Sequence, residues 1–295
     1  MSEVFVPRPL EELSLTWPRN LDHISASSLK MACRCPEQWR MVYVKGRRVP
    51  PNAAMIAGSS DHAAIEYSMQ QKIHTYQDLP VGVVQERFVY ELEERVEEVG
   101  IADLEVKKRG EKLSGVSAKR EELGKLKESG VIFVGNYQTQ VSPRVQPTAV
   151  EQEFVLRNDK FPVKVEGRID LIGTIDKDVA PRIIDRKRRG SFNKKPEPEW
   201  VVQGRIYQLA HEYPHDWHVT FTRNGSIQMG GDAYTIEPQP RWKSEKLLEH
   251  VIGEIGYYMQ RFGPDENWPA RGQLHTWACN YCAFRDDDSC WAWKG

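Results

Sequence analysis

Two carboxylates and a lysine in the middle of this chain have the spacing that a metal-dependent hydrolytic centre requires. Asp170 lies in the segment EGRIDLIG, and Asp185 and Lys187 lie in IIDRKR. Residues two apart on a β-strand point to the same face, so Asp185 and Lys187 are expected to project together. Two carboxylates with an imidazole are suitable ligands for Mg²⁺ or Mn²⁺, and a neighbouring lysine can polarise an attacking water. Such a centre supplies what phosphodiester cleavage needs.

The candidate imidazole is that of His62. Gly58, His62 and Glu66 recur at four-residue intervals within 53–71, so they lie along one face of a predicted helix. An isolated histidine is usually a surface or core residue. Gly58 allows close approach of the backbone on the same face, which favours a functional role for His62.

Gln203 and Tyr207 are one turn apart on a helix predicted for 199–212. Two interpretations stay open. They could form a hydrogen-bonded pair on the helix surface. Alternatively, Gln203 reaches the metal site or the scissile phosphate, and Tyr207 supports Gln203 or contacts DNA.

Four cysteines from opposite ends of the 295-residue chain, Cys35, Cys279, Cys282 and Cys290, could close one metal site. The C-x-x-C pair favours metal binding over buried structural thiols. Spacing alone does not choose between Zn²⁺ and an iron–sulfur cluster. Cys33 lies two residues from Cys35 and could exchange roles with it. A shared site would hold the two ends of the domain together.

Composition and charge restrict where nucleic acid could bind. The formal net charge is −1, so DNA binding must come from a local basic patch. The segment 182–195 holds seven Lys or Arg against one Asp, and a solvated basic loop is the alternative for it. The residues expected to hold DNA flank the catalytic strand and are Arg188, Arg189, Lys194 and Lys195.

The hydrophobic fraction of 40% and the charged fraction of 28% are typical of a globular protein. The sequence shows neither a signal-peptide pattern nor an apolar run of about 20 residues, which predicts a cytoplasmic protein without membrane contact. Disulfides are rare in that compartment.

The elements that must position these residues follow from periodicity. Helices are predicted for 27–33, from Pro36 onward, for 53–71, 84–99, 199–212 and 242–262, with a solvent-facing helical insertion over 103–129. Strands are predicted for 147–156, 164–176 and 182–185, joined as antiparallel hairpins, and Asn224-Gly225 predicts a further hairpin. An irregular leader precedes residue 24. We divide the chain into a helical N-terminal part (1–145), a core (146–240) and a C-terminal helix with its cysteine tail (241–295), which we expect to form one compact domain.

The ordered motifs resemble the PD-(D/E)xK nuclease superfamily, and within it the RecB-like exonucleases of the CRISPR-associated and AddB-type iron–sulfur group. Phage recombination exonucleases share the same core. The resemblance runs from ISASSLKMACRCPEQW through GSSDHAAIE, EGRIDLIG, IIDRKRR and QGRIY to CNYCAFRDDDSC. It implies an α/β fold of the restriction-endonuclease type, with a central mixed sheet flanked by helices, a helical N-terminal part and a C-terminal cysteine staple.

The resemblance also implies roles for single residues. The metal ligands would be His62, Asp170, Asp185 and the main-chain carbonyl of Arg186; the catalytic residues would include Lys187, Gln203 and Tyr207. The ligands of a [4Fe–4S] cluster, with Zn²⁺ as the alternative, would be Cys35, Cys279, Cys282 and Cys290. The pattern departs from the family in two places: Ile169 stands where the motif has proline, and seven residues separate the last two cysteines.

These features together predict a DNA exonuclease that depends on Mg²⁺ or Mn²⁺ and acts on free ends in recombination or repair. Its expected partners are DNA ends and a single-strand annealing protein or another recombination partner, in the host cytoplasm if the protein is phage-encoded. No G-x-x-x-x-G-K-[ST] loop is present, so unwinding would need a partner. A structure-specific endonuclease and a non-catalytic DNA-end-binding accessory protein are the alternatives. Polarity, strand preference and oligomeric state stay open.

Overall fold

The structure is a computed structural model. It describes residues 21–47, 51–108, 111–157, 163–176, 178–189, 197–221, 225–231 and 234–270, together with Cys279, Cys282, Phe284, Cys290 and Trp291. The predicted leader lies almost wholly outside the described residues, as do Lys194 and Lys195.

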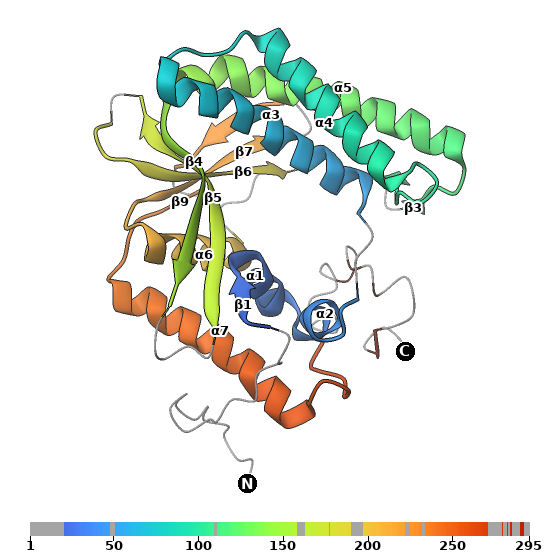
Figure 1. Ribbon diagram of the computed structural model, residues 1–295, viewed down its shortest axis with the longest axis vertical. Coiled ribbons are helices and arrows are strands. Elements are labelled where there is room, and N and C mark those ends of the chain that lie inside the picture. Colours follow the sequence, from blue (N-terminus) through green and yellow to red (C-terminus); the bar gives the residue numbers. More distant parts are fainter. Residues whose placement is uncertain are drawn as a thin grey trace.

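The described chain alternates helical and extended segments (Figure 1). The helices are α1 (Ala26–Arg34), α2 (Pro36–Trp39), the π-helical turn η2 (Arg40–Val44), α3 (Ala53–Thr75), α4 (Val81–Val99), α5 (Val116–Gln140), the 3-10 turn η3 (Ser142–Arg144), α6 (Pro198–Ala210) and α7 (Arg241–Phe262). The strands are β1 (His23–Ser25), β2 (Lys107–Lys108), β3 (Glu111–Lys112), β4 (Val145–Leu156), β5 (Lys164–Ile175), β6 (Arg182–Arg189), β7 (His215–Phe221), β8 (Ile227–Met229) and β9 (Thr235–Ile236).

Seven of the described strands form one mixed sheet around β5 and β6. Strand β5 pairs antiparallel with β4 along one edge, and its other edge is shared by β1, which is parallel, and β6, which is antiparallel. Strand β6 then runs parallel to β7, and β7 pairs antiparallel with β8 and β9. The predicted order of three antiparallel strands is confirmed in β4, β5 and β6.

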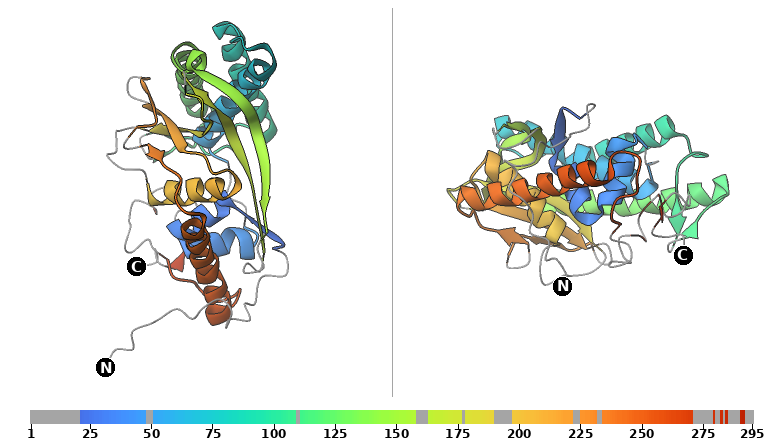
Figure 2. Two further views of the ribbon diagram at one scale, coloured as in Figure 1. Left: turned by 90° about the vertical axis from the view of Figure 1, so that its left-hand side faces the viewer. Right: turned by 90° about the horizontal axis from the view of Figure 1, so that it is seen from below.

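Helices cover both faces of the sheet, as Figures 1 and 2 show. On one face, the cluster that contains Ile183 is built with residues of α1, α6 and α7. On the other face, the cluster that contains Ile184 is built with residues of α3 and α5. Neighbouring residues of β6 therefore pack into different layers, as the two-residue period of a strand requires. The expected α/β class, a central mixed sheet flanked by helices, is confirmed.

Most of the predicted helices are confirmed, and one is misplaced. The helix expected over 103–129 begins only at Val116 and continues to Gln140. Turns and the β2–β3 hairpin occupy the residues before it. The many Lys and Glu residues of this segment indicated a helix, but they did not indicate the residue at which the helix begins. In the part of the chain that the structure describes, no helix has the length and apolar character of a membrane span.

Candidate active site

The two predicted carboxylates meet where strands β5 and β6 separate. The last antiparallel pair there is Leu171 with Ile184, so Asp170 and Asp185 are the next residues on the two strands and lie opposite each other. Beyond this point β6 pairs only with β7, and the edge of β5 opens toward β1. The fork in the ladder places two carboxylates side by side with no strand between them.

Helix α3 brings His62 to this fork. Nδ1 of His62 lies 3.1 Å from Oδ2 of Asp170. The guanidinium of Arg186 holds the helix in place, because it donates hydrogen bonds of 3.2 Å to the main-chain oxygens of Asp61 and His62. Arg186 points to the α3 face, opposite to Asp185, and stacks over the ring of Tyr137. The close approach expected at Gly58 is not seen, since a Cβ there would meet no atom within 4 Å.

Lys187 pairs with the second carboxylate. Its Nζ lies 2.5 Å from Oδ2 of Asp185, whose side chain is nearly inaccessible to solvent. Burial raises the pKa of Asp185, Lys187 opposes this shift, and the charge of Asp170 reinforces it. Burial also disfavours the ionised form of Asp170, but His62, followed by Lys187 and Arg186, outweighs burial and lowers its pKa.

The donor set fits a hard divalent cation. Oδ2 of Asp170 and Oδ2 of Asp185 are both buried, and beyond their ion pairs with His62 and Lys187 neither accepts a well-formed hydrogen bond. Two buried anionic oxygens at one point call for a positive charge between them, and oxygen ligands are those that Mg²⁺ and Mn²⁺ prefer. As they stand, no three His, Cys, Asp or Glu side chains within the described ranges form a closed metal site. In this structure the two oxygens face His62 and Lys187.

Gln203 and Tyr207 are hydrogen-bonded to each other but are buried, so they are not the surface pair that was one of the two interpretations; burial, followed by the charges of Asp185 and Asp170, raises the pKa of Tyr207. Nε2 of Gln203 and the hydroxyl oxygen of Tyr207 are 2.9 Å apart, and Oε1 of Gln203 faces Nζ of Lys30 on α1 at 3.5 Å. Tyr207 is 4% exposed, packs edge-on against Phe154 and stacks on the ring of His215. This geometry favours the supporting role for Tyr207 over contact with DNA.

Comparison with known families agrees with this geometry. Residues 23–286 match the model of the PD-(D/E)XK nuclease superfamily. The chain belongs to this superfamily. Nucleases of this superfamily use divalent metals such as Mg²⁺ or Mn²⁺. The search of curated proteins finds no significant match. A solved structure described as "Crystal structure of SSO0001" is similar at 17% identity, covering 97% of this chain and 94% of that one, with a TM-score of 0.39, too low to add to the assignment.

The described part of the predicted basic patch is neutralised within the PD-(D/E)XK core itself. Arg188 forms an ion pair with Asp61 and lies over the ring of Phe133. Arg189 pairs with Glu197 and lies over the ring of Trp200. Lys194 and Lys195 are outside the described residues. The two arginines therefore have protein partners in this structure, and a DNA phosphate would have to compete with those partners.

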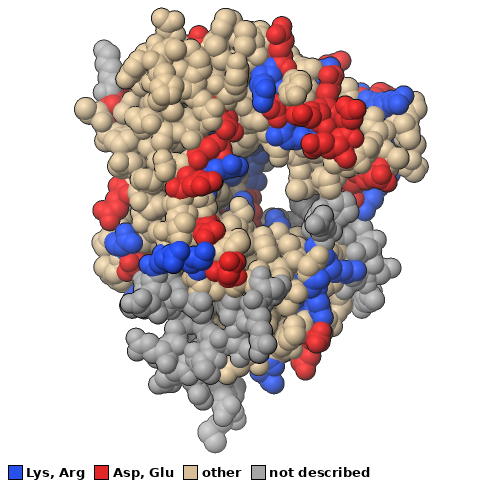
Figure 3. Space-filling model, viewed as in Figure 1, with Lys and Arg blue, Asp and Glu red and all other residues tan. Residues whose placement is uncertain are grey.

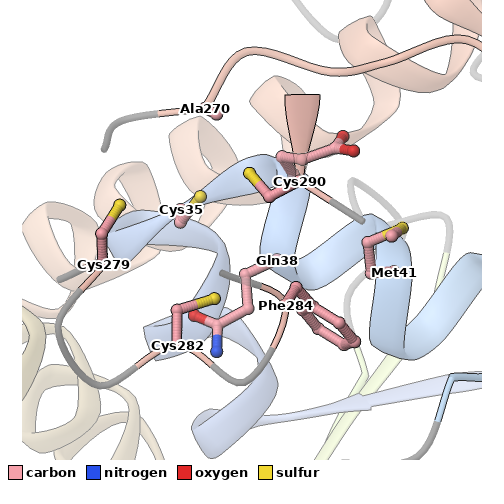
Figure 4. Close-up of a pocket in the computed structure, with 9 residues that line it drawn as sticks. Cys35, Gln38, Met41, Ala270, Cys279, Cys282, Phe284 and Cys290 are labelled. Atoms are coloured by element: carbon pink, nitrogen blue, oxygen red, sulfur yellow. The ribbon is translucent and has the colours of Figure 1, made fainter. Parts of the chain in front are cut away.

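The four predicted cysteines line one pocket. Figure 4 shows Cys35 from the α1–α2 junction with Cys279, Cys282 and Cys290 from the C-terminal tail around a common space. The main-chain N–H of Cys282 donates to the oxygen of Cys279 at 3.1 Å, which forms the turn of the C-x-x-C pair. Cys33 does not line this pocket. Within the described residues, however, no three of these thiols lie close enough together to form a metal site as they stand.

Other contacts also join the two ends of the chain. Glu37 and Arg40 form a buried ion pair in α2 and η2, and Glu37 Oε2 accepts a hydrogen bond from the main-chain N–H of Trp268. The ring of Trp268 stacks on Trp39 at 5.7 Å, and Trp291 Nε1 donates to the oxygen of Trp268. The clamp between the N-terminal helices and the segment after α7 does not depend on the cysteines alone.

Sequence reasoning missed a third carboxylate at the fork, that of Glu151. The β4–β5 register places Glu151 opposite Asp170, on the side away from Asp185. Its φ of 52° is in the left-handed region, which is unusual for a residue with a side chain. Glu151 is paired with Arg168, and burial, followed by the charge of Asp170, raises its pKa. The available signal was an acidic residue in the strand preceding that of Asp170.

Proposed function

We propose that the protein is a divalent-metal-dependent DNA exonuclease that acts at free ends. One observation carries the hydrolytic part: Asp170 and Asp185 face each other at the β5–β6 fork with buried carboxylate oxygens, and Lys187 lies beside them. The residues that would hold the cation are His62, Asp170, Asp185 and the main-chain carbonyl of Arg186. A cation bound there would lower the pKa of a water and neutralise charge on the phosphate.

The protein's own groups supply the rest of the chemistry. Lys187 is placed to orient a water by donating a hydrogen bond and to stabilise charge that develops on the phosphate. Gln203, fixed by Tyr207, presents its amide on the same face of the sheet. Ordering these groups in advance spares the reaction the cost of organising them at the transition state.

The shape of the molecule supports a preference for ends. Figure 3 shows the surface hollowed between the α3–α5 layer and the region of α1 and α2, with both basic and acidic side chains around the hollow. A narrow opening admits a free strand end more readily than the middle of a closed duplex. An endonuclease would require a groove open along its length.

The test uses end-labelled linear DNA and covalently closed circular DNA with Mn²⁺ or Mg²⁺. An exonuclease degrades the linear DNA progressively and leaves the circle intact. Cleavage of the circle would support the endonuclease alternative. Binding of ends without cleavage, in either metal, would support the non-catalytic alternative. A role in recombination or repair in the cytoplasm, with an annealing protein as partner, is proposed from the family resemblance alone.

We also propose that Cys35, Cys279, Cys282 and Cys290 hold one structural metal centre, a [4Fe–4S] cluster with Zn²⁺ as the alternative. Their common pocket supports this proposal, since four thiol groups from both ends of the chain converge on one space. Thiolates are ligands for both kinds of centre. Iron, acid-labile sulfide and zinc analysis of anaerobically purified protein distinguishes the two.

A further inference from the structure

Two cations on helix α1 lie beside the candidate metal centre and were not among the predicted site residues. Lys30 and Arg34 are four residues apart, so they lie on one face of α1, about 6 Å apart along the helix axis. Helix α1 packs against α6 and α7, on the face of the sheet to which Asp185 and Lys187 point. Nζ of Lys30 reaches Oε1 of Gln203 at 3.5 Å.

Lys30 is a half-buried cation that no carboxylate of the described residues approaches to ion-pair distance. Within the described ranges its Nζ makes this one long hydrogen bond and has no carboxylate at ion-pair distance. Burial lowers the pKa of Lys30 and the positive charge of Lys187 lowers it further, whereas the carboxylates of Asp185 and Glu199, beyond ion-pair distance, oppose this shift. An ammonium group that is partly removed from water without a directly bound counterion destabilises a fold. A half-buried cation in this state is suited to an anion that arrives from outside.

Arg34 is in a similar state. One of its terminal nitrogens donates to Oε1 of Gln38 at 3.0 Å, but its Nε is buried without a hydrogen-bond partner. No carboxylate of the described chain pairs with it. Arg188 and Arg189 also have buried nitrogens without a hydrogen-bond partner, but they differ from Arg34 in that each has an acidic partner and an aromatic ring beneath it.

We propose that Lys30 and Arg34, the α1 cation pair, bind backbone phosphates of the DNA strand that lies at the metal centre. This inference rests on the proposed function, because it takes DNA as the substrate. Phosphate oxygens accept hydrogen bonds from both ammonium and guanidinium groups, and these charge-assisted bonds are strong. Lys30 adjoins Gln203, and Arg34 directly precedes Cys35. The strand therefore runs along α1 from the metal centre toward the cysteine pocket.

The first experiment measures single-stranded DNA binding by fluorescence anisotropy over a range of salt concentrations, with Ca²⁺ replacing Mg²⁺ to suppress cleavage. Lys30→Met and Arg34→Met should each weaken binding about tenfold to a hundredfold, the loss of one hydrogen bond to a charged group. Each should lower the slope of log affinity against log salt by about 0.7. The control is Lys127→Met, which removes an exposed α5 lysine paired with Glu93 and should change neither quantity.

Thermal unfolding separates a binding role from a structural one. Removing an uncompensated charge should leave the melting temperature of Lys30→Met equal to that of the wild type or a few degrees higher. A structural lysine would give the opposite result, a lower melting temperature with unchanged DNA affinity. That result would overturn the proposal for Lys30. Lys30→Arg keeps the charge and should retain most of the affinity.

The second experiment locates the phosphate that Lys30 binds. Single methylphosphonates, which lack the phosphate charge, are placed one at a time along the DNA strand. Wild-type affinity should fall at a particular position that has no effect on Lys30→Met, because the variant does not bind that phosphate. Equal decreases at every position in both proteins would refute the interaction. The same preparations are assayed for cleavage with Mn²⁺. If DNA binding changes as described but the wild type does not cleave DNA, the proposed function is refuted and this inference is not. If the wild type cleaves DNA but Lys30→Met and Arg34→Met keep the wild-type salt slope of binding, this inference is refuted and the proposed function is not.

Discussion

Replacing Asp185 by Asn should abolish both cleavage and the stabilisation of the fold by divalent metal. Asp185 is 2% exposed, and its Oδ2 lies buried at the fork with only Lys187 beside it. Because burial raises its pKa in the folded state, ionising Asp185 costs more free energy in the folded protein than in the unfolded chain, and this cost lowers stability where the group is ionised. A cation at the fork removes that cost. Asn is neutral and nearly isosteric, so the metal-free variant should be at least as stable as the metal-free wild type.

The size of the metal effect follows from linkage. A ligand that binds only the folded state at 100 times its Kd stabilises it by about 2.7 kcal/mol. In a protein of this size about 1 kcal/mol raises Tm by about 2–4 °C, so the wild type should gain about 5–10 °C. Asp185→Asn should gain almost nothing. Lys187→Ala should keep most of the gain but lose cleavage, because lysine is not a ligand.

The assay is scanning calorimetry of EDTA-treated protein titrated with MnCl₂, with cleavage of end-labelled linear DNA measured on the same samples. A full Tm shift in Asp185→Asn would place the metal elsewhere and remove Asp185 from the ligand set. Normal cleavage by Lys187→Ala would remove the assignment of the D-x-K motif. Asp265→Asn is a matched control, since this exposed aspartate pairs with Lys45 far from the fork.

Three further predictions concern other parts of the molecule. Burial lowers the pKa of His215 and of His218 to about 3. The free energy of unfolding should therefore be highest above about pH 6.5 and fall as the pH is lowered, by about 2 kcal/mol per histidine at pH 5. Urea unfolding of His215→Phe at pH 7 and pH 5 should show roughly half the acid sensitivity of the wild type. Neutralising Arg188, Arg189, Lys194 and Lys195 together should lower the salt slope of DNA binding by about one unit or less for each phosphate that is no longer bound, and an unchanged slope would show that this patch does not bind DNA. Anaerobically purified protein should be brown, and serine at Cys35, Cys279, Cys282 or Cys290 should remove the colour and lower Tm, whereas Cys33→Ser should do neither. Colourless protein with one zinc and no sulfide would show a zinc site in place of the cluster. Metal-free protein with reactive thiols would exclude both the cluster and the zinc site.

The sequence predicted the elements of the β5–β6 fork because each depends on local pattern. Alternating apolar residues and short polar connections indicated β4, β5 and β6, and two-residue spacing put Asp185 and Lys187 on one face, where they form an ion pair. The register that places Asp170 opposite Asp185 is not local. It depends on residues 177–181 between the strands and on packing in both layers, which a single sequence does not specify. The same limit concealed Glu151, whose place beside Asp170 follows only from the β4–β5 register.

The basic residues show most clearly what a sequence leaves undetermined. A run of positive charges in the catalytic strand suggested DNA binding, but a sequence shows where charges are, not which of them have partners in the fold. Asp61 and Glu197, which are not adjacent to them in the sequence, neutralise Arg188 and Arg189. The α1 cation pair stands in an ordinary helix with no such density, and no acidic side chain of the described chain pairs with it. A half-buried cation without an acidic partner is costly to keep. The cations available to a substrate are therefore identified by the lack of an acidic partner in the fold, and not by the number of positive charges nearby in the sequence. Whether a cation has such a partner is a property of the folded chain.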